Sequence, residues 1–213
     1  MTLIDNFDQK CSVCGKSSPQ PELLSTNSSG YPDLDLRPPE MQRSTMNTWI
    51  HECPHCGYVA GSLEDELKIS SDFLKTEKYL TCDGYAFRGK LSKLFYKSYL
   101  IAKETHNPLI CFISLRNCAW DCDDWDDENA ADIRRLAIPY LDELIRDDEE
   151  NRNNILVMKS DFLRRSGEFE KLIREYENLT LGEELLDNII RFELQKADEN
   201  DTNCYTVEDV VGQ

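Results

Sequence analysis

Two short stretches, Cys11-Ser-Val-Cys14-Gly15 and Cys53-Pro-His-Cys56-Gly57, decide how the N-terminal part of this chain folds. Each stretch places two thiols on one tight turn. The glycine after the second cysteine permits a positive φ, so that backbone N–H groups can point toward the sulfurs. Four thiolates complete a tetrahedral Zn(II) site and leave no open position for a substrate. The spacing therefore predicts one zinc ion per chain, bound by Cys11, Cys14, Cys53 and Cys56.

Other uses of these cysteines stay open. The Cys-Pro-x-Cys-Gly form also occurs in rubredoxin, where iron replaces zinc and carries electrons. A thiol–disulfide catalyst would need one pair at the start of a helix in a βαβ unit, which neither stretch offers. His51 and His55 flank the second stretch, but four thiolates make a further ligand unnecessary.

The composition favours a folded protein that does not bind nucleic acid. The chain has 213 residues, of which 40% are hydrophobic, and its formal net charge is −17. Such a charge repels phosphate backbones, because binding to nucleic acids depends on Lys and Arg. Residues 1–62 carry four basic and seven acidic side chains, so nucleic-acid binding by this part is disfavoured without being excluded. We see neither a signal peptide nor a membrane-spanning run, and we expect a cytoplasmic protein with no membrane partner.

The segment between the two cysteine pairs is long for a metal ribbon. It contains Tyr31-Pro-Asp-Leu-Asp-Leu-Arg-Pro-Pro-Glu-Met-Gln-Arg43, in which charged and apolar side chains alternate before two prolines. One interpretation is a stiff recognition loop; the other is a loop whose charges pair with one another while its apolar side chains cover the ribbon. The candidate recognition residues are Asp33, Asp35, Arg37, Glu40 and Arg43. Residues 46–52 are expected to form a short strand that leads into the second turn.

After residue 62 the pattern becomes helical. Apolar side chains recur at helical spacing, and short turns at Ser166-Gly167 and Leu181-Gly182 imply antiparallel neighbours. The expected helices cover about residues 85–104, 107–120, 152–165, 168–178 and 183–198. Another helix is expected after residue 128; it carries Ile133, Leu136, Tyr140, Leu141 and Leu144, and Pro139 should kink it or mark its start. The stretch from Leu163 to Tyr176 resembles the turn and second helix of a tetratricopeptide repeat. The acidic residues 121–128 are interpreted as a helix-capping turn and not as a calcium loop, because the glycine and glutamate of such a loop are missing.

The cysteines outside the two turns are Cys82, Cys111, Cys118, Cys122 and Cys204. Three of them could share one helical face and form a second metal site. The simpler interpretation, which we favour, is that they serve as small apolar side chains where helices pack closely.

Residues 31–58 resemble those of an uncharacterised bacterial protein family of unknown function. Members have an opening Cys-x-x-Cys turn, an Asp-Leu-Asp-Leu-Arg-Pro-type string, a Cys-Pro-x-Cys-Gly-Tyr turn and a tetratricopeptide-like helical tail. The resemblance covers nearly the whole chain and implies a zinc ribbon fused to helices. It implies no activity.

The sequence thus predicts a mainly α protein. A small zinc-ribbon domain with short β elements (residues 1–62) precedes an antiparallel, tetratricopeptide-like helical domain (residues 63–213). The expected function is a protein–protein interaction module or adaptor rather than an enzyme, since no catalytic motif accompanies the closed metal site. The alternatives are a nucleic-acid-binding zinc ribbon and a rubredoxin-like iron protein.

Overall fold

The computed structural model describes residues 1–212 as two compact units. Unit 1 consists of Met1–Ser29 and Glu40–Asn129, and unit 2 of Gly30–Pro39 and Ala130–Gln213. The predicted fold class was a mainly α chain whose small N-terminal part has short β elements and a cysteine cluster, and this fold class is confirmed. The units do not divide at residue 62. Unit 1 continues through two long helices, and unit 2 includes ten residues from the segment between the cysteine pairs.

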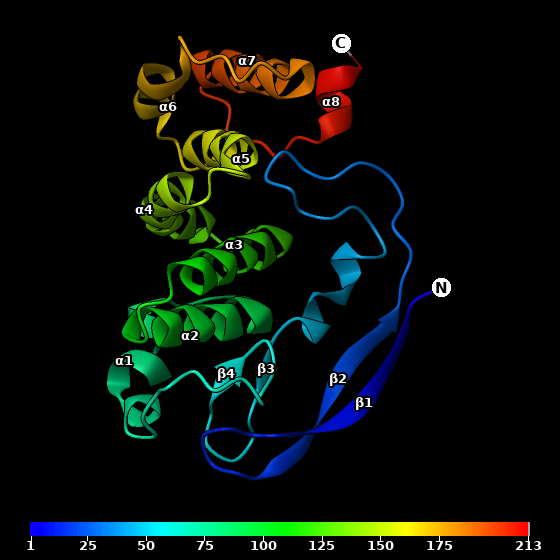
Figure 1. Ribbon diagram of the computed structural model, residues 1–213, viewed down its shortest axis with the longest axis vertical. Coiled ribbons are helices and arrows are strands. Elements are labelled where there is room, and N and C mark those ends of the chain that lie inside the picture. The colour runs from blue at the N-terminus through cyan, green and yellow to red at the C-terminus, as the bar shows by residue number, and fades with distance from the viewer. Residues whose placement is uncertain (213) are drawn as a thin grey trace. The chain divides into compact units, whose positions relative to one another are not determined.

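The N-terminal part of unit 1 contains two small antiparallel sheets (Figure 1). Strands β1 (Leu3–Lys10) and β2 (Ser17–Ser25) form a hairpin that the sequence analysis did not identify. Strands β3 (His51–Glu52) and β4 (Val59–Ala60) pair across the second cysteine turn. Only the end of the strand expected over residues 46–52 forms, because a 3₁₀ helix, η1 (Arg43–Thr48), occupies the rest. The Thr45 and Thr48 hydroxyls each donate to a backbone carbonyl three residues earlier, which favours a turn over a strand.

Short helical turns lead into the helices of unit 1. They are η2 (Phe73–Lys75), α1 (Glu77–Leu80) and η3 (Cys82–Gly84). Helix α2 (Lys90–Glu104) packs against α3 (Pro108–Asp124) and against β4. The Ser98 and Ser114 hydroxyls lie 2.9 Å apart between the two helices, so small side chains allow a close approach. Asn107 begins α3 by accepting a hydrogen bond from the Ile110 N–H, as expected of an N-cap residue before proline.

Unit 2 is a set of packed helices with one extended segment. Its helices are α4 (Ala130–Asp147), α5 (Arg152–Arg165), α6 (Phe169–Tyr176), α7 (Glu184–Asp198) and α8 (Val207–Val211). Helix α5 is central, since it packs against α4, α6 and α7. Its apolar core includes the fully buried Leu141, Phe162 and Leu172. Whether these helices form a regular tetratricopeptide-like repeat stays a prediction.

Candidate metal centre

The four cysteines of the two turns lie together in unit 1. Their sulfur atoms are all within 4.8 Å of one another. The Cys11 and Cys56 Sγ atoms are 3.7 Å apart, and so are those of Cys14 and Cys53. A tetrahedral site with metal–sulfur distances of about 2.3 Å requires sulfurs about 3.8 Å apart, whereas a disulfide bond is about 2.0 Å long. The arrangement can therefore hold one metal ion in a closed shell of four sulfurs.

The two turns have the same backbone geometry. Gly15 has a φ of +72° and Gly57 a φ of +75°. The Gly15 N–H donates to the Cys11 carbonyl at 2.8 Å, and the Gly57 N–H donates to the Cys53 carbonyl at 2.9 Å. A Cβ atom at either glycine would meet nothing within 4 Å, so the positive φ and not a lack of space requires glycine here. Sequence spacing alone was enough to predict both turns.

Residues beyond position 62 hold the turns in place. The Tyr79 hydroxyl, in α1, donates to the Gly57 carbonyl at 2.6 Å, and the Tyr79 side chain is fully buried. The Ser12 N–H donates to the Leu63 carbonyl at 2.8 Å, and the Leu63 N–H donates to Gln9 Oε1 at 2.9 Å. The position of the sulfur cluster therefore depends on Leu63 and Tyr79 as well as on residues 1–62.

The thiols differ in how readily they ionise. Burial raises the pKa of both Cys53 and Cys56, while a hydrogen bond from the Lys16 N–H lowers the pKa of Cys14. A metal ion bound here would have to displace protons from the two thiols with raised pKa values. Binding should therefore release protons and weaken as the pH falls.

Neither neighbouring histidine joins the sulfur cluster. His51 is buried, its Nδ1 atom has no hydrogen-bond partner, and burial lowers its pKa, which keeps the ring neutral. His55 is exposed on the second turn. Within residues 1–212 the four cysteines are the one group with metal-binding geometry.

The candidate recognition loop is partly buried in unit 2. Asp33, Asp35 and Arg37 are buried, whereas Glu40 is exposed and Arg43 is half-buried. Three of the five side chains expected on a recognition surface are therefore inaccessible to a partner. The alternative, that the charges pair within the chain, describes these three better, although they are not paired only with one another.

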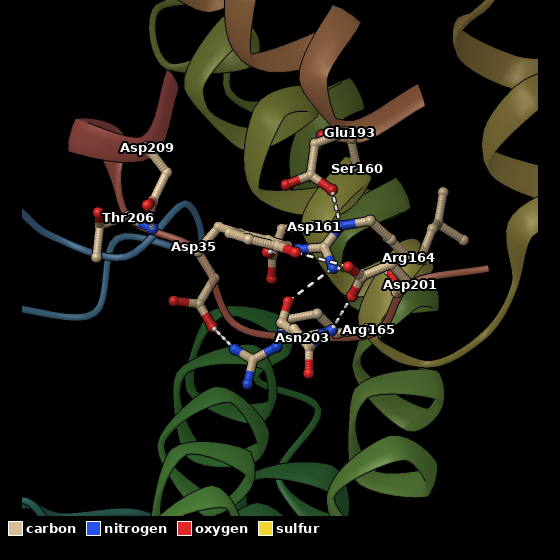
Figure 2. Close-up of polar contacts among 12 residues, drawn as sticks. Asp35, Ser160, Asp161, Arg164, Arg165, Glu193, Asp201, Asn203, Thr206 and Asp209 are labelled. Atoms are coloured by element: carbon tan, nitrogen blue, oxygen red, sulfur yellow. Dashed lines mark hydrogen bonds and ion pairs between the residues drawn. The ribbon is translucent and has the colours of Figure 1, made fainter. Parts of the chain in front are cut away.

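Side chains of the helices neutralise this loop. The Arg165 Nη1 atom, in α5, donates to Asp35 Oδ2 at 3.2 Å, and the Arg134 Nη2 atom, in α4, lies 3.9 Å from the same oxygen. Figure 2 shows Asp35 directed at this arginine of α5. Backbone bonds add to the attachment, because the Leu34 N–H donates to the Tyr205 carbonyl at 2.9 Å. The loop residues up to Pro39 are thus an integral part of unit 2, whereas Glu40 and Arg43 belong to unit 1.

A second group of buried ion pairs adjoins the pairs made by Asp35. The Arg164 guanidinium contacts both Asp161, at 3.0 Å, and Glu193, and it also donates to the carbonyls of Asp201 and Asn203 (Figure 2). Burial raises the pKa of Asp161 to about 6 and that of Glu193 to about 8. No local sequence pattern points to this group, because its members are spread over separate helices and a loop.

Two of the acidic residues 121–128, Asp121 and Asp127, accept hydrogen bonds near the ends of helices. Asp121 Oδ2 accepts hydrogen bonds from the Ser92 N–H, at 2.6 Å, and from the Ser92 hydroxyl, at 2.5 Å, near the start of α2. Asp127 accepts from the Arg88 N–H at 2.7 Å and from the Asn129 N–H at 3.0 Å. The break expected over residues 121–128 is shorter than predicted, because α3 continues through Asp124. The two capping carboxylates are buried and not solvated: Asp121 supports the start of α2, and Asp127 lies just before α4.

The remaining cysteines form no second metal cluster among residues 1–212. Four of them are buried, and Cys204 is exposed. The Cys118 thiol donates to the Ser92 carbonyl at 3.3 Å, where α2 and α3 pack together. The buried members therefore fill space between helices, as a small apolar side chain would.

None of the helices within residues 1–212 has the length and apolar character needed to cross a lipid bilayer. No protein-family model, curated protein or solved structure matches this chain. The resemblance to an uncharacterised bacterial family therefore stays a prediction.

Proposed function

We propose that this protein is a zinc-binding protein–protein interaction module or adaptor, in which the metal has a structural role. The observation that carries the proposal is the closed shell of four sulfurs, with two Sγ–Sγ distances of 3.7 Å that match the edge of a tetrahedral site. Four protein ligands leave no position for a substrate, which is typical of a structural zinc site. The metal would fix the two turns and the surfaces beside them.

The charges of unit 2 also favour a binding role over catalysis. Its buried acidic and basic groups face one another, and Arg164 is surrounded by Asp161, Glu193 and two carbonyl groups. These groups are fully buried, so a substrate could not reach them without unfolding of the unit. Their arrangement supports a structural function.

Two alternatives use the same cysteines. Four thiolates also suit iron in a rubredoxin-like electron carrier. Binding of nucleic acid through the ribbon is opposed by the formal charge of −17. We favour the zinc-dependent protein interaction over both.

The test is metal analysis of the purified full-length chain together with affinity capture from native lysate. Wild type is compared with the Cys11→Ser and Cys56→Ser variants and, as a matched control, with Cys204→Ser, which changes an exposed cysteine outside the centre. We expect one zinc per chain in wild type and control, and loss of zinc in the other two. A protein partner recovered by wild type should be lost with the zinc.

Three results would overturn the proposal. A red, iron-containing protein with a reversible potential would make it an electron carrier. Zinc retained by both Cys11→Ser and Cys56→Ser would place the metal elsewhere. Repeated recovery of RNA, in a salt-sensitive complex and without a protein partner, would favour the nucleic-acid alternative.

A further inference from the structure

The two edges of the β1–β2 hairpin differ in the hydrogen bonds that they can offer. Asn6 lies opposite Pro21, and Asp8 lies opposite Pro19. Proline has no N–H, so neither pair can exchange the two backbone hydrogen bonds of a bonded antiparallel pair. The bonds between the strands must therefore fall on the alternate β1 residues. These are Asp5, Phe7 and Gln9.

Neighbouring contacts follow the same alternation. The Cys11 N–H donates to the Lys16 carbonyl at 2.9 Å, which continues the inward bonds at odd-numbered positions. The Lys10 N–H points away from β2 and donates to Glu64 Oε1 at 3.3 Å. The backbone N–H groups of Asn6 and Asp8 accordingly lie on the outer edge of β1.

The outer edge of β1 carries backbone N–H groups, whereas that of β2 lacks them. The Asn6 N–H donates to the exposed side chain of its neighbour, Asp5 Oδ1, at 2.8 Å, a contact that an added strand would replace. Within residues 1–212, β1 pairs with no strand other than β2. Prolines at positions 19 and 21 remove the N–H groups from the outer edge of β2, a common protection against the addition of another strand. No proline protects β1, and all of its residues except Gln9 are exposed. The hairpin can therefore accept a further strand on one side only.

The side chains of β1 indicate what kind of strand would fit. Leu3, Ile4 and Phe7 keep 53%, 39% and 42% of their surface exposed, with Leu3 and Phe7 on one face of the strand and Ile4 on the other. Asp5 and Asp8 are exposed beside them. In antiparallel pairs, opposite charges and apolar residues stabilise each other when they lie directly across from one another.

We propose that the outer edge of β1 binds an extended, basic segment of a partner protein as a third antiparallel strand. This inference rests on the interaction function proposed above and specifies its surface. Residues across from Asp8 and Asp5 would be basic, and those across from Phe7 and Ile4 would be apolar. Backbone bonds to Asn6 and Asp8 give affinity, and the side chains select the sequence.

A capped peptide, Lys-Val-Thr-Lys-Val-Val, has this pattern when it runs antiparallel to β1. It is titrated into isotope-labelled, zinc-loaded full-length protein and followed by NMR. We expect shift changes along β1 and slower hydrogen exchange of the Asn6 and Asp8 amides. The same peptide with glutamate at both lysine positions should not bind.

Matched variants separate strand pairing from general charge attraction. Asn6→Pro removes an outward N–H without changing the charge and should weaken binding about tenfold, roughly the effect of one hydrogen bond. Asn6→Ala keeps the N–H and should bind as wild type does. Asp5→Asn combined with Asp8→Asn keeps the backbone and should also weaken binding. This double variant, together with amide exchange in wild type, decides the matter if Asn6→Pro does not fold.

Equal binding by wild type and Asn6→Pro would overturn the proposal, as would shift changes confined to residues outside β1. A dimer in sedimentation that Asn6→Pro converts to monomer would assign the edge to a second copy of this chain instead. Zinc content and partner capture remain separate measurements. If both of these behave as proposed while the peptide fails to bind, the surface is wrong and the interaction function stands.

Discussion

Replacing Asp35 with asparagine should destabilise unit 2 strongly. The Asp35 carboxylate is fully buried, 3.2 Å from Arg165 Nη1 and 3.9 Å from Arg134 Nη2. With an effective dielectric constant of about 20, these distances give attractions of about 5 and about 4 kcal/mol. Much of this attraction is offset by the free-energy cost of removing the carboxylate from water. The neutral asparagine avoids that cost. Breaking a buried pair while both arginines stay buried should cost about 3–5 kcal/mol.

The assay uses the distribution of tryptophans. Trp49, Trp120 and Trp125 all belong to unit 1, so fluorescence reports the unfolding of that unit, while circular dichroism reports the helices of both. In urea, the Asp35→Asn variant should lose stability mainly in the circular dichroism transition. Hydrogen exchange of α5 should become faster.

Asp198→Asn is the control, since this carboxylate is exposed in the same unit. Its free energy of unfolding should change by no more than about 0.5 kcal/mol. The reasoning would be refuted if Asp35→Asn cost less than about 1 kcal/mol, within the range for exposed ion pairs, or if α5 exchanged at the wild-type rate. Either result would mean that the loop is not held by its buried charge.

Three further predictions concern unit 1. Because burial raises the pKa of Cys53 and Cys56, protons compete with the metal as the pH falls. The zinc affinity, measured by chelator competition, should drop about tenfold per pH unit for each proton released. A constant affinity between about pH 7.5 and 5.5 would contradict this prediction. Tyr79→Phe removes the hydrogen bond to the Gly57 carbonyl and should weaken zinc binding about 10- to 100-fold in the same assay. An unchanged affinity would show that this contact does not support the turn. Gly89→Ala would place a methyl group against Asp121 Oδ2 and disrupt the cap of α2. The free energy of unfolding, followed by fluorescence, should fall by about 2–3 kcal/mol, and a wild-type midpoint would argue against that cap.

Local patterns predicted much of this structure. The bounds of α5 agree with the expected helix over residues 152–165, and α2, α3, α6 and α7 end within a few residues of their expected limits. Helical periodicity and end signals such as Asn107-Pro108 are set by neighbours in sequence. The hairpin was missed for a local reason, because Pro19 and Pro21 argue against a strand unless it lies at an edge.

The buried charges could not be predicted in this way. Asp35 and Arg165 are far apart in sequence, and an Asp-Leu-Asp-Leu-Arg string is typical of an exposed segment. Charged side chains are rarely buried unless a partner is at hand, and that partner is supplied by helices whose positions the sequence does not give. For the same reason the candidate recognition residues could be identified as a group, but their burial could not.

The sequence by itself determined the two cysteine turns, since a Cys-x-x-Cys-Gly turn depends on five consecutive residues and on the positive φ of glycine. Tertiary structure alone decided that the four sulfurs meet at a spacing suited to one ion, and that Tyr79 supports them from beyond the ribbon. It also decided that ten residues of the segment between the turns, Gly30–Pro39, belong to unit 2. The physical reason is that these features come from contacts between residues distant in sequence, whose free energy depends on burial and on opposite charge in three dimensions.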